Sequence, residues 1–262
     1  MTYRQMLKIA LEQSAIDSSC SAEDFLKGEN TVVKSVKNER ARRYLKLPFI
    51  LDLTSYGSGI VASVGEGYEE IATDYINRFT EYHCFETPNL HVLSEALRPT
   101  GADVCFMAEY WLAKPERLGM AKCEYRTKIL TPSDFSTLYT PEWSNALCSE
   151  RRHLDRLCIG AYDGDRLIAL CGASADCEDM WQIGIDVLPE YRHRGIASAL
   201  TSSLALEIIS LCKVPFYCCA WSNVASARNA IAAGFVPAWV QVTARRVEEI
   251  RGMNGECVMR NA

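Results

Sequence analysis

The segment from residue 180 to residue 213 constrains the fold of this chain more than any other, because an apolar strand passes directly into a long apolar helix. The run "MWQIGIDVL" has the length and character of a largely buried strand. From Ile196 to Ile208, large apolar residues recur at four-residue steps, which predicts a helix across 194–213. Between the two stands "PEYRHRG", so charge and a flexible glycine are concentrated at the junction.

This junction predicts an anion site. Where a chain enters a helix, several backbone N–H groups have no partner within the helix. Those groups and the helix dipole favour a bound anion, best of all a phosphate. Gly195 lets the backbone approach a ligand closely, because glycine has no Cβ. Arg192, His193 and Arg194 add donors and positive charge at the same rim. A solvated surface loop is the alternative that the spacing leaves open.

The first part of the chain is predicted to form an α/β subdomain over residues 1–118. Helical periodicity marks the first segment, and "SAED" predicts a second helix that begins at Ser21. Strands are expected at 44–53, 59–64 and 103–112, and helices at 68–79 and 88–99. "GSGIVA" fits a dinucleotide fingerprint by letters, but its β-branched continuation favours a strand. The polar stretch 113–122, with its proline and glycine, marks a domain boundary.

The second part, residues 121–262, is predicted to form a mixed sheet with helices packed on it. "TPSDF" predicts a helix capped by Thr131 and Asp134. "RLCIGAYDGDRLIALCGAS" predicts a hairpin around Asp163 and Gly164. After the helix of the junction come a strand at 214–221, a short helix ending at Gly234, and a final strand.

Composition excludes several classes of function. A net charge of −5 argues against nucleic acid and anionic membranes as partners. The twelve cysteines contain no C-x-x-C pair and the four histidines lack metal-ligand spacing, so we expect free thiols and no metal. The first segment lacks the continuous apolar core of a secretory signal, and no apolar run is long enough to span a membrane. A cytoplasmic protein is expected.

The junction also resembles a known motif. "VLPEYRHRGIASAL" looks like the coenzyme-A-binding motif of the GNAT superfamily of acyl-CoA N-acyltransferases: Arg or Gln, two residues, Gly, one residue, then Gly or Ala. The resemblance implies that backbone amides of this loop hold the diphosphate of the cofactor. The residues it assigns to cofactor binding are Arg192, His193, Arg194, Gly195, Ile196 and Ala197.

The resemblance covers about residues 121 to 250. "YRTKILTPSDF" is similar to the first strand and helix of the family, and the hairpin is similar to its central hairpin. "AWSNVASARNAIAAGF" resembles the motif in which Asn223 and Ser226 would contact the cofactor. In layout the whole chain is most similar to the zwittermicin-A-resistance-type branch, which carries an additional N-terminal half. Whether residues 1–118 are a degenerate copy of the second half stays open.

In the family, two neighbouring parallel strands splay apart and acyl-CoA lies in the opening. The resemblance implies that these strands are "QIGIDV" and "PFYCCAW", and that the pantetheine arm pairs with the backbone near Ile185 and Val187. A backbone N–H there would polarise the thioester carbonyl and stabilise the oxyanion. Asn223 would bind the pantetheine arm, and it also fits the N-cap of the following helix; both roles can hold.

The sequence departs from the family at the residues that move protons. The tyrosine that often protonates the leaving thiolate is replaced by Ala230, and Tyr217 is an alternative acid or simply a buried strand residue. The position of the usual general base is Trp181, which cannot accept a proton. Asp179 and Asp186 are the candidate catalytic carboxylates, and water leading to a more distant carboxylate is a further alternative.

These observations predict an acyltransferase of the GNAT fold that moves an acetyl group from acetyl-CoA to the amine of a small molecule, by direct attack in a ternary complex. The first half would cover the acceptor side. Two alternatives remain: a non-catalytic protein that senses acyl-CoA, and an enzyme that acetylates a protein N-terminus or lysine. The oligomeric state is not predicted. The carboxylates available to the acceptor in the first half are Asp52, Glu66, Glu69 and Glu70.

Overall fold

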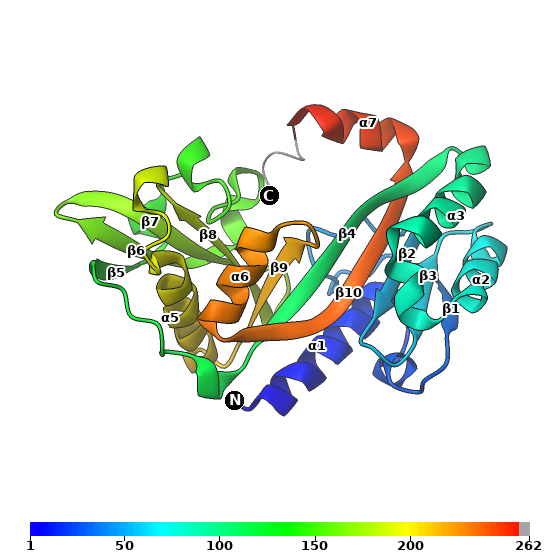
Figure 1. Ribbon diagram of the computed structural model, residues 1–262, viewed down its shortest axis with the longest axis horizontal. Helices are drawn as coiled ribbons and strands as arrows, with labels where there is room; N and C mark the ends of the chain where they lie inside the picture. Colours follow the sequence, from blue (N-terminus) through cyan, green and yellow to red (C-terminus); the bar gives the residue numbers. More distant parts are fainter. Residues whose placement is uncertain (257–262) are drawn as a thin grey trace. The chain divides into compact units, whose positions relative to one another are not determined.

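A computed structural model describes residues 1–256 and divides them into two compact units (Figure 1). Unit 1 contains residues 1–9 and 111–237, and unit 2 contains residues 10–110 and the chain from 238 onward. This division differs from the predicted boundary near residues 118–121. The reason is that the strands β4 (Ala102–Ala113) and β10 (Phe235–Arg246) each contribute residues to both units.

Unit 1 is built on a mixed sheet, as predicted. Its strands follow the order β9-β8-β7-β6-β5, and all neighbours are antiparallel except β8 and β9, which are parallel. The hairpin lies where the sequence predicts it, with β6 ending at Asp163. The strands are β5 (Arg126–Leu130), β6 (Asp155–Asp163), β7 (Arg166–Ser174), β8 (Met180–Val187) and β9 (Val214–Ala220).

One helix dominates the core of unit 1. The helix α5 (Ile196–Ser210) packs on β6, β7 and β8, and α6 (Val224–Ala233) packs beside it (Figure 1). The four apolar residues that predict this helix are all buried in one cluster: Ile196, Leu200, Leu204 and Ile208. The short helix α4 (Pro132–Phe135) has the predicted capping box, in which Thr131 and Asp134 bond reciprocally.

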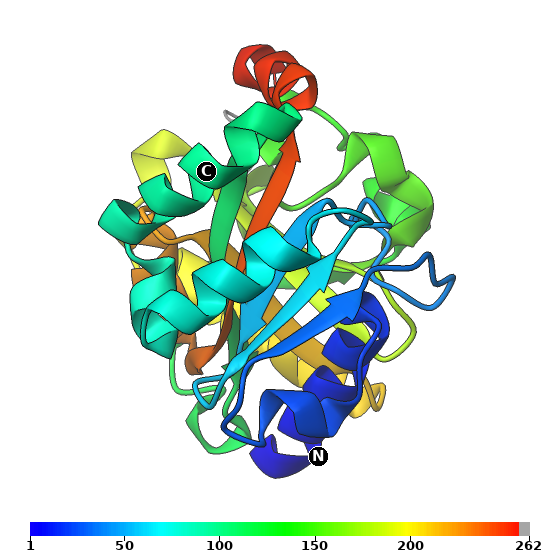
Figure 2. The ribbon, with the colours of Figure 1, turned by 90° about the vertical axis from the view of Figure 1, so that its right-hand side faces the viewer.

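Unit 2 has its own strands in the order β1-β3-β2-β10-β4, and β1 (Thr31–Lys34) is not predicted from the sequence. The helices α2 (Glu69–Arg78) and α3 (Thr87–Leu97) cover one face of these strands, as Figure 2 shows. The other elements of this region are β2 (Leu51–Ser55), β3 (Ile60–Val64), α1 (Tyr3–Ser18), whose first residues belong to unit 1, and α7 (Val247–Glu256).

Two predictions in unit 2 need correction. The capping box at Ser21 exists, but it opens a single 3-10 turn, Ala22–Phe25, rather than a helix. The strand predicted at 44–53 begins only at Leu51, because Pro48 cannot donate to a ladder. The strand predicted within "GSGIVA" is confirmed. The remaining 3-10 turns are Glu81–Phe85, Arg98–Thr100, Pro115–Arg117, Pro141–Trp143, Ser149–Leu154 and Pro189–Tyr191.

The eleven cysteines within residues 1–256 are free, and Cys257 lies outside the described residues. Among those residues, no helix is both long and apolar enough to cross a membrane. The described part of the chain also holds no group of His, Cys, Asp or Glu side chains arranged to bind a metal ion.

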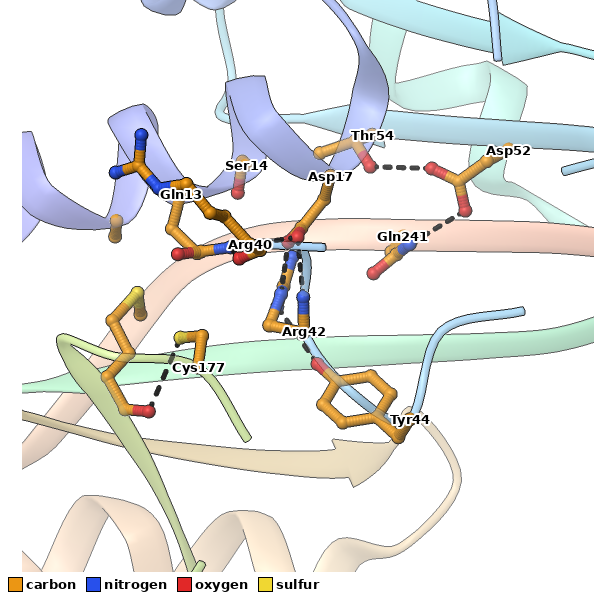
Figure 3. Close-up of polar contacts among 12 residues, drawn as sticks. Gln13, Ser14, Asp17, Arg40, Arg42, Tyr44, Asp52, Thr54, Cys177 and Gln241 are labelled. Atoms are coloured by element: carbon orange, nitrogen blue, oxygen red, sulfur yellow. Dashed lines mark hydrogen bonds and ion pairs between the residues drawn. The ribbon is translucent and has the colours of Figure 1, made fainter. Parts of the chain in front are cut away.

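A buried ion pair organises the polar interior of unit 2. The Arg42 guanidinium contacts the Asp17 carboxylate, which also accepts the backbone N–H of Arg42 at 2.9 Å (Figure 3). Gln13 donates to the same carboxylate at 2.9 Å. The guanidinium lies 5.3 Å and 5.4 Å from the ring centroids of Tyr110 and Trp239. A charge this deeply buried is costly without partners, so the loss of either ion-pair partner would leave the other charge uncompensated and destabilise the fold.

Asp52 is buried on β2, and within the described part of the chain its carboxyl group forms no ion pair. Its carboxyl accepts from the Gln241 amide at 2.7 Å and from the Thr54 hydroxyl at 3.0 Å (Figure 3). Burial raises the pKa of Asp52 to about 7, and these two hydrogen bonds counteract part of that rise. The other carboxylates predicted for the acceptor, Glu66, Glu69 and Glu70, are exposed.

This pKa predicts how stability depends on pH. Between the usual value near 4 and the folded value near 7, the folded protein keeps a proton that the unfolded chain has released. The contribution of Asp52 therefore favours the folded state below about pH 4 and is lost as pH rises through 7. In the wild type, ionisation of Asp52 should lower the free energy of unfolding by roughly 2–3 kcal/mol between pH 5 and pH 8. Asp52→Asn should not show this decrease when both proteins are unfolded with urea. An equally steep fall in the variant would contradict this assignment.

Candidate active site

The junction between β8 and α5 is a row of backbone donors. After β8 ends at Val187, a 3-10 turn leads to two residues with left-handed backbone, His193 with φ of 62° and Gly195 with φ of 74°. Within the described part of the chain, the N–H groups of residues 193–198 have no acceptor, and the first satisfied one is that of Ala199. Successive unpaired N–H groups in such a turn form a concave anion site. A Cβ built on Gly195 would meet no atom within 4 Å, so the space there is open.

The two arginines of the junction form hydrogen bonds that fix the loop, and they also contribute positive charge to it. Arg192 donates through Nε to the carbonyl oxygen of Val187 at 3.1 Å. Arg194 donates to the hydroxyl of Tyr125 at 2.7 Å and to the carbonyl oxygen of Glu190 at 3.2 Å. All of the side chains from 192 to 194 are exposed. Their charges therefore remain near the row of N–H groups while their bonds fix the backbone that carries it.

The pairing between the parallel strands β8 and β9 ends midway along β8. Their pairing runs from Met180 opposite Val214 to Ile183 opposite Tyr217. Beyond that point, β8 continues to Val187 and β9 continues to Ala220 with no further partners across this gap. Ile185 and Val187 thus lie on the part of β8 that pairs with β7 but has no β9 partner, and this part of the strand leads directly to the row of N–H groups.

Asn223 and Ser226 lie at the start of α6, just after β9. Asn223 caps this helix, because its side-chain oxygen accepts the N–H of Ser226 at 3.0 Å. The Ser226 hydroxyl lies 2.8 Å from that of Tyr217, which is only 4% exposed. Burial raises the pKa of Tyr217 to about 12, so its phenol keeps its proton at neutral pH. Ala230 is fully buried in the core and offers no group for proton transfer.

The two candidate catalytic carboxylates are not brought together. Asp179 precedes β8 and forms an exposed ion pair with Lys213 at 3.2 Å. Seven steps of about 3.3 Å along the chain separate it from Asp186, so it stands about 23 Å away, at the end of β8 that pairs with β9. The structure therefore gives Asp179 no place beside the unpaired strands.

Asp186 faces a small cavity beside the unpaired end of β8. The cavity has a volume of about 310 Å³, and the residues of the loop 141–147 form its other side. Burial raises the pKa of Asp186, while hydrogen bonds from Asn145 and Ala146 favour its charged form. The lining residues are Pro141, Glu142, Ser144, Asn145, Asp186, Val187, Leu188, Pro189 and Arg192.

Comparison with known proteins agrees with this geometry. Residues 123–209 match the acetyltransferase (GNAT) family. The matched segment contains β5 to β8, the row of N–H groups and nearly all of α5. No curated protein is significantly similar to the chain. The match supports the GNAT acetyltransferase family and agrees with the mixed sheet and flanking helices of the fold.

The solved structures that the chain matches are distant in sequence. A GNAT-family putative acetyltransferase from Novosphingobium aromaticivorans is 19% identical, over 55% of this chain and just under two thirds (66%) of its own, with a TM-score of 0.40. A GCN5-related N-acetyltransferase-like protein from Streptococcus suis is 15% identical, over 61% and 69%, with a TM-score of 0.44. A tandem GNAT protein from the clavulanic acid biosynthesis pathway is 16% identical, over 61% and 59%, with a TM-score of 0.42.

The loop 141–147 is the part of the candidate site that sequence reasoning missed. Its residues show no helical or strand periodicity. Two glycines gave the available signal, because Gly172 and Gly184 stand alone inside apolar strands. An isolated glycine in a strand often marks the close approach of another backbone.

The left-handed residues of the junction give a testable prediction about stability. Gly195→Ala should lower the free energy of unfolding by about 1–2 kcal/mol, because an L-residue is strained at its φ of 74° although no atom blocks the new methyl group. His193 already has such a backbone, so His193→Gly should cost less or stabilise. Urea unfolding of both variants tests the assignment. Equal destabilisation by the two substitutions would contradict it.

Proposed function

We propose that this protein is an N-acetyltransferase that moves an acetyl group from acetyl-CoA to the amine of a small molecule. The observation that carries the proposal is the row of unpaired N–H groups at residues 193–198, which opens onto free space at Gly195. The N–H groups and the dipole of a long buried helix suit a diphosphate. Each charge-assisted bond contributes about 1.5–3 kcal/mol, so a few such bonds account for micromolar binding.

The residues present fit coenzyme A. The N–H groups of residues 193–197 would hold the diphosphate, with Arg192 and Arg194 supplying positive charge. The unpaired backbone at Ile185 and Val187 would pair with the pantetheine arm, and Asn223 would bind it through the amide nitrogen that its capping role leaves over. When bound, acetyl-CoA supplies an activated acyl group on a thioester. No metal takes part in this proposal.

Direct attack by the amine requires the chain to orient two substrates and to stabilise an oxyanion. Backbone N–H groups of the unpaired part of β8 would polarise the carbonyl, which is typically the largest electrostatic contribution in acyl transfer. Tyr217 stands at the last paired position of β9, with its hydroxyl 2.8 Å from that of Ser226, and is the acid proposed for the leaving sulfur. Asp179 has no part in this mechanism because of its distance.

The cavity beside Asp186 is proposed to hold the acceptor. Its volume of about 310 Å³ is at the small end for ligand sites, which favours a small molecule over a protein chain. Glu142 contributes a carboxylate whose pKa is lowered by a hydrogen bond from Thr140, so it stays charged and would attract a protonated amine. The amine would release its proton to solvent before it attacks the thioester.

A non-catalytic acyl-CoA sensor is the second candidate. Two observations favour it: Ala230 replaces the usual acid with a buried methyl group, and Asp186 already accepts bonds from the loop 141–147. Both candidates require coenzyme A binding and differ only in turnover.

Calorimetry with coenzyme A tests the shared requirement. We expect micromolar binding that Gly195→Ala weakens at least tenfold, because its methyl group would stand where the diphosphate lies. Gly67→Ala is the matched control, since it has a similar φ of 88° and equally open space, but lies in unit 2. Binding that both variants weaken alike, or no binding at all, would reject the proposal.

Turnover separates the two candidates. The protein is incubated with acetyl-CoA and a panel of small primary amines, and free thiol is followed with time. Acetylation of an amine at a rate above the buffer reaction supports the enzyme. Silence across the panel, together with confirmed coenzyme A binding, supports the sensor.

A further inference from the structure

We infer that Asp186 is a positioning residue, which fixes the loop 141–147 against the sheet and thereby builds the wall of the acceptor cavity. The inference concerns the wall itself, and its link to an acceptor rests on the proposed function. It gives Asp186 a role other than the general base that the sequence suggests.

The carboxylate of Asp186 binds two consecutive residues of the loop. One oxygen, Oδ2, accepts the backbone N–H of Asn145 and that of Ala146, each at 2.9 Å. The other oxygen, Oδ1, accepts the side-chain amide of Asn145 at 2.7 Å. Charge-assisted bonds of this kind are about twice as strong as neutral ones. Three of them on one carboxylate leave a single lone pair for any other partner.

A pair of glycines lets the loop backbone rest directly on the sheet. Gly172 on β7 and Gly184 on β8 are paired in register. A Cβ on Gly184 would lie 1.8 Å from the carbonyl oxygen of Asn145, and one on Gly172 would lie 1.9 Å from that of Ala146. No side chain fits in such a space. The same two loop residues therefore bond to Asp186 through their N–H groups and lie over the glycines with their carbonyl groups.

The two sides of this contact define the cavity. Trp143, Ala146 and Leu147 are buried in a small apolar cluster with Phe135, so their side chains anchor the loop. Between these anchors, Ser144 and Asn145 face the cavity opposite Asp186 and Val187. Without the bonds to Asp186, this stretch would lift from the glycines and the wall would be lost. The row of N–H groups at residues 193–198 would stay, because it depends on β8 and α5.

Two variants separate positioning from base catalysis. Asp186→Asn presents an amide to the two backbone N–H groups and loses the carboxylate. Gly184→Ala keeps the carboxylate but displaces the loop. Asp165→Asn is the surface control, because its side chain is fully exposed. If Asp186 is a positioning residue, the first two variants behave alike and Asp165→Asn resembles the wild type.

Hydrogen exchange in the full-length protein is the readout that needs no acceptor. We expect exchange of residues 141–147 to become at least tenfold faster in Asp186→Asn and Gly184→Ala, with coenzyme A affinity within about twofold of the wild type. Unchanged exchange in Asp186→Asn would overturn the inference. If neither variant binds coenzyme A while the wild type does, the wall is not separate from the cofactor site, and the inference also fails.

If the amine panel yields an acceptor, the kinetic constants provide a second readout. Positioning predicts that both variants raise KM for the amine at least tenfold with a smaller change in kcat. A base at Asp186 predicts instead a loss of about 10²–10⁴ in kcat for Asp186→Asn alone, with Gly184→Ala retaining kcat. If no amine is acetylated, the proposed function fails while the exchange experiment still decides the role of Asp186.

Discussion

The first turn of α5 is the feature on which the functional site depends. A helix that is apolar on nearly every face must be buried, and burial against β6 to β8 fixes where its N-terminus emerges. The unpaired N–H groups of residues 193–198 therefore point from a rigid position rather than from a mobile loop. Left-handed backbone at Gly195 brings those donors together, and its missing side chain keeps the approach open. Strand, turn and helix together form the proposed anion site before any charged side chain is considered.

The same strand serves two sites through its two edges and faces. On its β7 side, β8 is paired from Gln182 to Val187. On its β9 side, pairing stops at Ile183, which frees backbone groups for an extended ligand. Asp186 and Gly184 project on the face that carries the loop 141–147, whereas Ile183 and Ile185 pack toward α5. The two-residue period of the strand thus places Asp186 and Gly184 against the loop 141–147, and Ile183 and Ile185 against α5.

The sequence predicted the elements whose signals are local. The four-residue spacing from Ile196 to Ile208 and the cap at Thr131 depend on near neighbours, and both match the structure. The box at Ser21 is equally local, yet only one 3-10 turn follows it. Local signals therefore locate the start of an element better than they measure its length.

Features that join distant residues could not be predicted in this way. The contact between Asp186 and Asn145 spans 41 residues, and the buried bond between Asp52 and Gln241 spans 189. Neither contact leaves a pattern along the chain. The predicted domain boundary differs from the observed units for the same reason, because β10 pairs with β2, which lies far earlier in the sequence. The single glycines at 172 and 184 show that a backbone approaches, but they do not identify which one.

The central claim is that the amides at the start of α5 bind the diphosphate of coenzyme A. Backbone amide chemical shifts, followed by NMR while coenzyme A or pantetheine is added, test it directly. The account predicts that coenzyme A shifts the resonances of residues 193–198 and that pantetheine, which lacks the diphosphate, leaves them nearly unchanged. Equal shifts with both ligands, or shifts confined to other residues, would contradict it.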